Sequence, residues 1–475
     1  MMNKQLFWIL VIAICLVIGI WSLGFWAVGC SSTPQETATT STSITSTTMV
    51  AISAVGTPDA SFGTNGTTVY DTGMISPFPN STDDRGNSIA IDRNGKILVA
   101  GYRWPFGGKK MAIWRYDSDG ALDKSFGDNG VTLTSLLDPF LYGQGNCMII
   151  DSNNNILVAG ISPPAVALWR YKSDGIPDNN FGASGKAAYA TSWESSANAV
   201  AIDSSGKILV TGYLADKYEI DSIPYQAKYM AIWRYNTDGS TDGSFGTNGI
   251  VIYYLTSESR GNNIGNAIVA DSHNNILVAG YSFNAVNVIN VMTVWRYNSN
   301  GTTDESFGDH GKTVIPVADP HSPISSKANS IIIDPSGYLL VTGKYNGKMA
   351  IWRLTTNGEI DSSFGNGGMV TDDIGTDNGG TSIISDSLGR ILVTGDRWNG
   401  SGFDMAIWRY DAKGNLDPSF GNNGILTDNV TNQNYPENGY AFGNSIRLDD
   451  FGRILVTGYV DYPDSNRNMV IWRYR

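Results

Sequence analysis

Tryptophan, arginine, tyrosine and aspartate recur together along this chain in a pattern that could carry chemistry. The first complete copy reads "MAIWRYDSDGALDKSFGDNG" and spans residues 111–130, and near-copies occupy residues 230–249 and 405–424. An arginine close to carboxylates can form hydrogen-bonded ion pairs, and aspartates spaced before a glycine can bind calcium. A catalytic residue is usually needed once, whereas this group is repeated. The repetition therefore favours a structural role.

The arginine of this group needs a partner. On a strand, Arg115 faces away from its tryptophan and tyrosine neighbours, and both faces of such a strand are expected to lie between sheets. A guanidinium buried there is costly unless a carboxylate pairs with it. Each repeat offers two aspartates, one in the turn after its first strand (Asp92) and one in "DxSFG" (Asp123). We predict a structural Arg–Asp ladder, and the sequence leaves both aspartates open as partners.

Other signals for catalysis or for a bound cofactor fail on inspection. Copies of "YDSDGALD" carry Lys172, Thr355 or Lys413 where a calcium site needs oxygen ligands. The stretch "SFGDHGKT" resembles the end of a phosphate-binding loop, but Ser306 replaces its first glycine. The three histidines lie in three different turns or loops, and no HExxH, CxxC or GxSxG motif occurs. We predict no catalytic residue, no metal and no cofactor.

Composition limits the partners and the fold class. The chain has 475 residues and a net charge of −12, which disfavours a polyanionic partner such as nucleic acid. Hydrophobic residues make up 41% and aromatic residues 11%, as in a folded protein, and 54 glycines indicate many tight turns. Short runs rich in Val, Ile, Thr, Tyr and Trp indicate an all-β protein.

The elements that position these residues are seven copies of one unit of about sixty residues. The phenylalanine of "SFG" or its equivalent stands at Phe62, Phe126, Phe181, Phe245, Phe307, Phe364 and Phe420. The tryptophan of "IWRY" or its equivalent stands at Trp114, Trp169, Trp233, Trp295, Trp352, Trp408 and Trp472. Each unit predicts four strands, which in the first copy are 87–92, 96–102, 111–116 and 131–134. The second strand is apolar at consecutive positions, so both of its faces are expected to be buried.

Repeated four-stranded sheets buried on both faces predict a seven-bladed β-propeller, with a solenoid as the competing arrangement. The two ends of the repeat region favour the ring. Residues 67–70 supply a fourth strand with no blade of its own, and the last blade ends after its third strand at 469–474. Pairing these two segments would close the ring, whereas a solenoid would need capping elements that are absent.

The units "LDKSFGDNGVTLT", "GNCMIIDSNNNILVAG" and "VALWRYKSDG" resemble the delta-60 repeat of bacterial surface and secreted proteins. The resemblance covers residues 57–475. It implies a β fold and an extracytoplasmic setting, and it carries over no catalytic residues.

The first residues resemble a different class of segment. A positive start precedes the apolar run 6–29, which ends in "WAVGC", so residues 1–30 resemble a bacterial lipoprotein signal. That resemblance implies that Cys30 is lipidated and becomes the mature N-terminus, although Ala27 stands where leucine is commonest. The run is also long enough to be an uncleaved membrane anchor. Residues 31–56 are rich in Ser and Thr and predict a flexible tether. Both alternatives place the rest of the chain outside the cytoplasm, attached to a membrane of the cell envelope.

The loops predict where a ligand would bind. Strands alternate in direction, so loops after first and third strands share one face of the ring, and these loops repeat almost unchanged. Loops after second and fourth strands share the other face and vary in length and content, as binding loops do. The aromatic candidates for ligand binding in or beside these variable loops are Trp104, Phe106, Tyr142, Trp193, Tyr225, Trp398, Phe403, Tyr435 and Tyr440. Packing of these aromatics within their own loops is the alternative.

We expect a monomeric, non-catalytic, membrane-anchored binding or scaffold protein that uses this variable face to bind a glycan, a peptide or a protein. The alternative is an extracellular hydrolase or lyase with carboxylates near the channel mouth. Its candidate carboxylates are Asp83, Asp84, Asp138, Glu194, Glu258 and Asp372. No spacing selects a pair among them.

Overall fold

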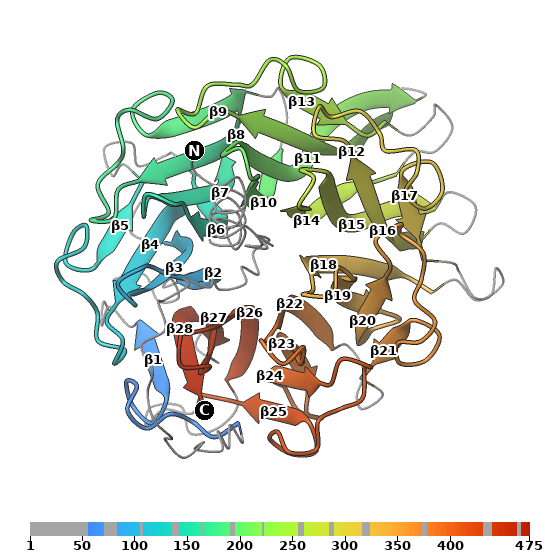
Figure 1. Cartoon of the computed structure of the whole chain (residues 1–475). Coiled ribbons are helices and arrows are strands. Elements are labelled where there is room, and N and C mark those ends of the chain that lie inside the picture. Colours follow the sequence, from blue (N-terminus) through green and yellow to red (C-terminus); the bar gives the residue numbers. More distant parts are fainter. Residues whose placement is uncertain are drawn as a thin grey trace, which may run out of the picture.

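The chain folds as seven four-stranded antiparallel sheets arranged around a central opening, as the computed structural model shows (Figure 1). The structure describes residues 56–70, 83–104, 108–134, 142–163, 165–190, 195–220, 223–254, 261–284, 289–315, 324–372, 378–430, 439–462 and 467–475. Its described part holds strands and turns and no helix, so it has no helix that could cross a membrane. The prediction of an all-β, seven-bladed propeller with four-stranded blades is confirmed.

The blades are numbered here in chain order. Blade 1 contains β2 (Arg85–Ile91), β3 (Ile97–Arg103), β4 (Lys110–Tyr116) and β5 (Val131–Leu133). Blade 2 contains β6 (Gln144–Ile150), β7 (Ile156–Ser162), β8 (Ala165–Tyr171) and β9 (Lys186–Ala190). Blade 3 contains β10 (Ser196–Ile202), β11 (Ile208–Ile220), β12 (Ile223–Tyr235) and β13 (Ile250–Ile252). Blade 4 contains β14 (Ile264–Ala270), β15 (Ile276–Asn284), β16 (Ile289–Tyr297) and β17 (Lys312–Val314).

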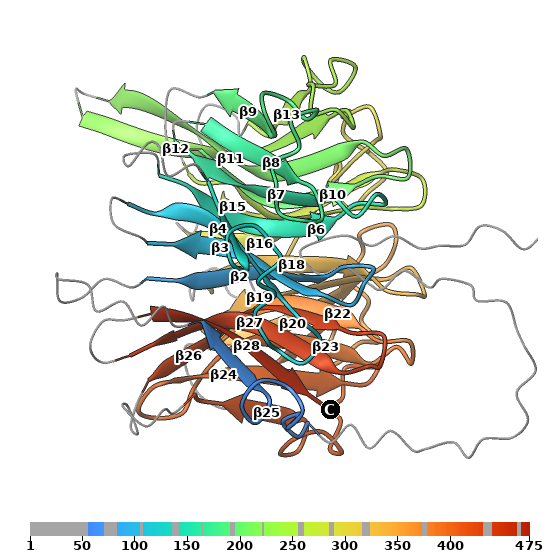
Figure 2. The same cartoon turned by 90° about the vertical axis from the view of Figure 1, so that its left-hand side faces the viewer.

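Blade 5 contains β18 (Ser326–Ile333), β19 (Leu339–Tyr345), β20 (Lys348–Leu354) and β21 (Met369–Thr371). Blade 6 contains β22 (Gly379–Ser385), β23 (Ile391–Trp398), β24 (Phe403–Tyr410) and β25 (Ile425–Asp428). Blade 7 contains β26 (Tyr440–Leu448), β27 (Ile454–Asp461) and β28 (Arg467–Tyr474), and its fourth strand is β1 (Thr67–Tyr70). The first strand of each blade lies nearest the central opening (Figure 1). The β11–β12 hairpin, with 13 residues in each strand, extends beyond the body of the ring (Figure 2).

The blades pack through the apolar second and third strands. In blade 1, Leu98, Ala100 and Ile113 pack toward blade 2, while Val99 and Trp114 pack toward blade 7. Side chains alternate across a strand, so a run such as "ILVAG" fills the space on both sides of its blade. Trp114 is fully buried, and the equivalent tryptophans are buried in all seven blades. The core is therefore a series of interfaces between neighbouring blades.

The ring closes as the chain ends predict. Strand β1 pairs antiparallel with β28, in the register Thr67↔Trp472 to Tyr70↔Met469. Outside these strands the backbone nitrogen of Gly56 donates to the Arg475 carbonyl at 2.8 Å, and that of Arg475 donates to the Thr57 carbonyl at 2.9 Å. Blade 7 thus gains its outer strand from the other end of the repeat region, and each sheet has four strands.

A belt of side-chain amides ties the first strands together around the opening. In each blade the register between the first two strands shifts at one extra residue, such as Asn87 between Gly86 and Ser88. This bulged residue is an asparagine in six blades and Thr381 in blade 6, and each side chain donates to a backbone carbonyl of the next blade at 2.6–3.0 Å. Asn444 closes the belt by donating to the Gly86 carbonyl at 2.8 Å.

The bulge also explains an invariant glycine on the second strand. A Cβ atom on Gly101 would lie 1.8 Å from the Arg85 carbonyl oxygen, and the equivalent glycines are equally crowded by backbone. Only glycine fits where the two strands approach so closely.

Blade 7 breaks the pattern of its first strand with a buried charge. Arg447 stands where the other blades have alanine, valine or isoleucine, and its side chain is buried. Its Nη1 donates to its neighbour's carbonyl, while its Nε and Nη2 have no hydrogen-bond partner in the described part of the chain. Burial lowers the pKa of this guanidinium to about 9.

Candidate binding surface on the variable face

The repeated arginines form the predicted ladder, and the partner is the aspartate of "DxSFG" or its equivalent. In six blades the arginine Nε donates to the aspartate Oδ2 at 2.7–2.9 Å, as Arg115 does to Asp123. At the closure Arg473 approaches Asp59 with its Nη2 at 2.9 Å. The other candidates, such as Asp92, instead accept backbone N–H groups of their own turns. The ladder is confirmed, with one of its two possible partners selected.

Each rung holds more than one ion pair. The guanidinium carbon lies 4.5–4.7 Å from the ring centre of the "SFG" phenylalanine in all seven blades. In six of them the arginine Nη1 also donates to a backbone carbonyl in a loop of the next blade, as Arg115 does to Ser173. The repeated residues therefore connect neighbouring blades, and every described side chain in this set already has partners.

The strand directions divide the ring into two faces. We call the face with the loops after first and third strands the constant face, and the opposite one the variable face. The ladder lies at the constant face. No group of His, Cys, Asp and Glu that could hold a metal ion occurs within the described residues.

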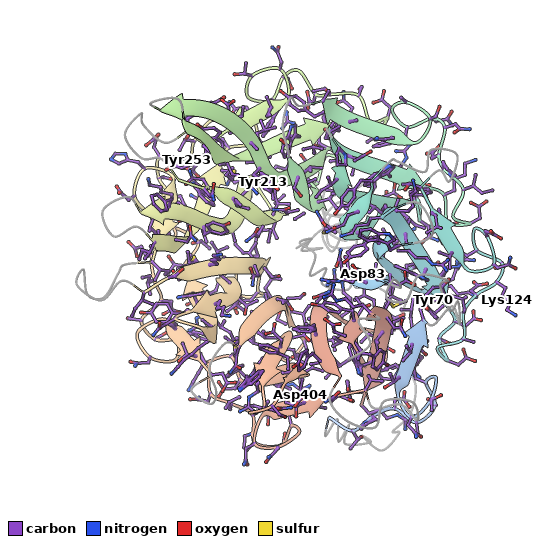
Figure 3. All side chains as sticks on the ribbon, turned by 180° about the vertical axis from the view of Figure 1, so that it is seen from behind. Tyr70, Asp83, Lys124, Tyr213, Tyr253 and Asp404 are labelled. Atoms are coloured by element: carbon purple, nitrogen blue, oxygen red, sulfur yellow. The ribbon has the colours of Figure 1, made fainter. Side chains whose placement is uncertain are left out.

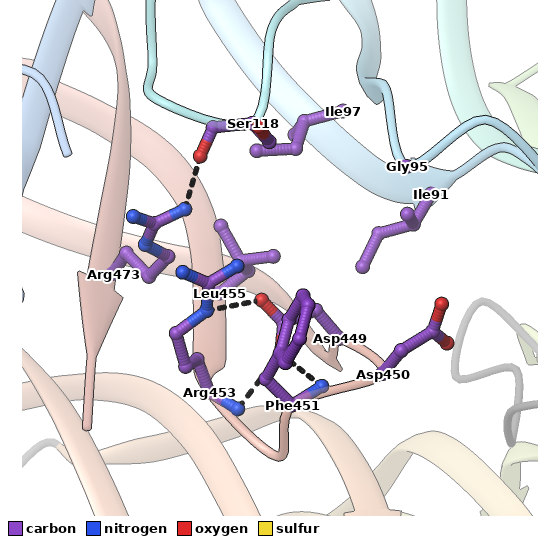
Figure 4. A pocket seen from close by; sticks show the side chains of 10 residues that line it. All are labelled: Ile91, Gly95, Ile97, Ser118, Asp449, Asp450, Phe451, Arg453, Leu455 and Arg473. Carbon is purple, nitrogen blue, oxygen red and sulfur yellow. Dashed lines mark hydrogen bonds and ion pairs between the residues drawn. The ribbon is translucent and has the colours of Figure 1, made fainter. Parts of the chain in front are cut away.

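A cavity with an apolar lining lies at the constant face, between blades 7 and 1 (Figure 4). Ile91, Ile97, Leu455 and the exposed Phe451 line it, together with charged groups of the turn at 449–453. Its arginines are engaged, because Arg453 and Arg473 pair with Asp449 and Asp59. The cavity thus adjoins the ladder and contains none of the predicted ligand-binding residues.

The structure places five of the nine predicted aromatic residues with their side chains, all on the variable face. Trp104, Tyr142 and Tyr440 are 43%, 38% and 39% exposed, and Trp398 and Phe403 are partly buried. Tyr225 lies on β12 opposite Tyr218. Phe106, Trp193 and Tyr435 lie outside the described residues, as does Cys30.

Part of this set belongs to a continuous band of rings across blades 6, 7 and 1. Trp398 contacts Phe403 edge to face at 5.1 Å between ring centres, and Phe403 contacts Phe442 at 5.5 Å. Phe442 then stacks on Tyr459 at 4.7 Å with an interplanar angle of 17°. Tyr440 joins the band through Phe403 at 6.3 Å. Trp398 and Phe403 come from the β23–β24 hairpin of blade 6, and the stacked pair Phe442 and Tyr459 comes from blade 7.

Cations continue the band into blade 1. The Arg85 guanidinium lies 4.2 Å from the Tyr459 ring centre and 5.7 Å from that of Tyr102. Lys109 then lies 3.7 Å from the Tyr102 ring centre, 5.2 Å from that of Tyr142 and 5.9 Å from that of Trp104. This arrangement, from Trp398 to Trp104, is called the aromatic band below. It can offer ring faces, N–H donors and a phenolic hydroxyl to a ligand.

The described acidic residues considered for catalysis are held by arginines. Asp83 pairs with Arg85 at 3.1 Å and accepts the Tyr102 hydroxyl at 3.1 Å. Burial, opposed in part by the charge of Arg85, raises the pKa of Tyr102, so this phenol stays protonated at neutral pH and is a poor base.

The other described carboxylates are similarly engaged. Asp372 accepts Nε of Arg397 at 3.1 Å and Nε1 of Trp408 at 3.0 Å, and Asp84 lies 3.6 Å from Arg103. Asp138, Glu194 and Glu258 lie outside the described residues. A hydrolase or lyase using a carboxylate pair stays a prediction.

Sequence reasoning missed several members of the band. Phe442 and Tyr459 lie inside strands that the repeat makes look ordinary, and Arg85 reaches Tyr459 from almost the other end of the chain. One signal was available, because a tyrosine follows the invariant glycine of the second strand in four blades and is absent there from three. A residue that departs from a strict repeat in some blades is a candidate for function.

Four segments of the chain match the family described as a domain of unknown function (DUF5122) beta-propeller: residues 93–126, 274–307, 335–364 and 389–420. No curated protein matches the sequence. Among solved structures, the chain is similar to the polysaccharide lyase Uly1, with 9% identity, a TM-score of 0.46, and 86% of this chain and 93% of that one covered.

It is also similar to Sqt1 from Chaetomium thermophilum, with 11% identity, a TM-score of 0.39, and 84% and 96% covered. A GH43_12 protein retrieved from a capybara gut metagenome shows 9% identity, a TM-score of 0.30, and 84% and 94% covered. The matched segments lie in blades 1, 4, 5 and 6 of this β-propeller, and each is similar to the DUF5122 repeat.

Proposed function

We propose that this protein is a non-catalytic binding protein that holds a glycan on its variable face. The aromatic band is the observation that carries the proposal. It joins side chains from three blades into one surface, with Trp104, Tyr142 and Tyr440 exposed. Aromatic faces stack on the apolar faces of sugar rings, and neighbouring polar groups accept or donate hydrogen bonds to their hydroxyls.

The contrast between the two faces supports this location. The constant face repeats the same interactions in each blade, whereas the described residues form this band only across blades 6, 7 and 1. A symmetric scaffold needs such a departure to recognise one particular ligand. The alternative role, packing within single loops, accounts for Trp398 on Phe403 but not for contacts that cross from blade 7 to Arg85 in blade 1.

The test is a glycan array probed with the full chain in detergent, followed by titration of the glycans that bind. Replacing both Trp104 and Trp398 with alanine should weaken binding by about 2 kcal/mol or more, the range of aromatic hot spots. Phe451→Ala is the matched control, because that ring is 74% exposed on the constant face. Absence of any glycan binding, or equal losses for the control and the double variant, would refute the proposal.

The proposal includes an extracytoplasmic location and attachment to a membrane. Residues 1–30 act as a lipoprotein signal and Cys30 is acylated, with the uncleaved anchor as the competing arrangement. The order of positive start, apolar run and "AVGC" supports it. Mass spectrometry of the mature protein should find an acylated Cys30 as its first residue. An intact segment from Met1 to Cys30 would show the uncleaved anchor instead.

A further inference from the structure

Four blades share a tyrosine paired with a cation on the variable face. The tyrosine follows the invariant glycine of the second strand in blades 1, 3, 4 and 7. The ring-centre distances are 3.7 Å for Lys109 on Tyr102, 4.2 Å for Lys228 on Tyr213, 4.8 Å for Lys327 on Tyr281 and 4.2 Å for Arg85 on Tyr459. Each of these four tyrosines therefore has a positively charged side chain over the face of its ring.

Three of these four cations lack a carboxylate partner. Arg85 pairs with Asp83, whereas no Asp or Glu of the described residues forms an ion pair with Lys109, Lys228 or Lys327. The seven arginines of the ladder, by contrast, each pair with an aspartate. In a chain whose net charge is −12, these three ammonium groups have no carboxylate partner among the described residues, and Lys109 Nζ donates to the amide oxygen of Gln144 at 3.4 Å. A ring face holds an ammonium group in place and leaves its remaining N–H donors available.

The three lysines lie on the variable face, Lys109 just before β4, Lys228 on β12 and Lys327 on β18. Figure 3 shows Tyr213, whose ring lies under Lys228, and Asp83 nearer the central opening than Lys124, which lies at the outer edge. Lys109, Lys228 and Lys327 come from blades 1, 3 and 5, so they are spread over different blades of this face. The aromatic band meets these lysines at Lys109.

We propose that the bound glycan is acidic, with carboxylate or sulfate groups that Lys109, Lys228 and Lys327 bind on the variable face. This inference rests on the proposed function and specifies its ligand class. A polymer with charges at regular intervals can contact several separated lysines while its sugar rings lie on the aromatic band. An acidic peptide would supply the charges without the sugar faces, so the observations favour the glycan.

The experiment compares charged and neutral forms of the same polymers. Polygalacturonate, alginate and chondroitin sulfate are titrated against the full chain, beside forms whose carboxyl groups are reduced and sulfates removed. Polyglutamate serves as the acidic peptide. At least one acidic glycan should bind about tenfold or more tightly than its neutral form, and its affinity should fall as salt is raised.

The lysine substitutions locate the site. Lys228→Met combined with Lys327→Met should weaken binding of that acidic glycan about tenfold or more. Lys124→Met, on the exposed outer edge, should leave it unchanged. Thermal denaturation of each variant shows whether the ring is intact, and a double variant that fails to fold is replaced by the single Lys228→Met.

The outcomes separate the two proposals. Equal binding of charged and neutral glycans, with a loss only in the Trp104 and Trp398 double variant, would overturn the acidic ligand and leave the proposed function standing. Polyglutamate bound as tightly as the acidic glycans would show a peptide site and overturn this inference. No binding of any glycan would overturn both.

Discussion

Replacing Asp59 with asparagine should destabilise the ring at its closure. This carboxylate is fully buried and accepts the backbone nitrogen and hydroxyl of Ser61 at 3.1 and 2.8 Å. Three arginines surround it, namely Arg473 at 2.9 Å, Arg475 at 2.6 Å and Arg453 at 3.6 Å. Asparagine fills the same space without the charge. The substitution therefore leaves the buried Arg473 without its ion-pair partner.

The size of the effect follows from two observations. Removing one partner of a buried ion pair costs about 3–5 kcal/mol, because the remaining charge is uncompensated. Part of this is pH-dependent. Burial alone would raise the pKa of Asp59, but the hydrogen bonds from Ser61 and Arg475 and the charge of Arg473 lower it from 3.8 to about 2. Such a shift corresponds to about 2 kcal/mol of stability at neutral pH.

The sign of the pH dependence can be stated. A carboxylate with a lowered pKa in the folded state stabilises the protein above its unfolded value of 3.8, and this contribution is lost as the pH falls toward about 2. The stability gap between the wild type and Asp59→Asn should be about 3 kcal/mol at pH 7. It should narrow by about 2 kcal/mol near pH 2, because the wild type then loses the same charge.

Urea unfolding followed by tryptophan fluorescence measures this gap at pH 7 and at acid pH. Asp309→Asn is the control, because its side chain is 87% exposed on a turn of the constant face. Hydrogen exchange should also be faster in β1 of Asp59→Asn, where the closure would open. A gap below about 0.5 kcal/mol at pH 7, the scatter of ordinary surface substitutions, would refute the reasoning. A gap that stays constant with pH would refute the lowered pKa.

Three further substitutions test features of the fold. Asn444→Ala removes the amide that donates to the Gly86 carbonyl, so the free energy of unfolding measured in urea should fall by about 1–2 kcal/mol. An unchanged urea midpoint would show that this hydrogen bond of the belt does not stabilise the fold. Gly101→Ala places a Cβ 1.8 Å from the Arg85 carbonyl oxygen, so the free energy of unfolding should fall by about 3 kcal/mol or more. A lower melting temperature would show this loss. A variant as stable as the wild type would contradict this account of the glycine. Arg447→Ile replaces a buried, partly unpaired guanidinium with the residue that three other blades carry there, and should raise stability at pH 7 by about 1–4 kcal/mol in the same melting experiment. A lower melting temperature would mean that a hydrogen bond or ion pair of Arg447 stabilises the folded protein.

The fold was predictable because seven copies of one pattern reinforce each other. The unpaired segment at 67–70 and the missing outer strand after Tyr474 were enough to predict closure without coordinates. The partner of Arg115 could not be predicted from the sequence, because Asp92 and Asp123 both recur in every repeat and only their positions in the fold distinguish them. Asp92 faces its own turn, whereas Asp123 faces the guanidinium.

The candidate site was predictable only in part. Trp104, in a loop, and Trp398, at the end of β23, stand where the sequence departs from the repeat, and that departure identifies them. The contacts between them pass through Tyr459 and Arg85, which are more than 370 residues apart in the chain and meet only because the ring brings blade 7 beside blade 1. A pattern within one repeat contains no information about which loop residues of neighbouring blades will touch.

The closure at Gly56 and Arg475 also determines how the ring is presented. Both residues lie at the constant face. There the backbone nitrogen of Gly56 donates to the Arg475 carbonyl, and the backbone nitrogen of Arg475 donates to the Thr57 carbonyl. Any segment that precedes residue 56 therefore joins the ring at this face. The proposed membrane attachment and the proposed glycan site would then be on opposite faces of the ring. A bound polymer on the variable face would leave the point where the preceding segment joins the ring uncovered.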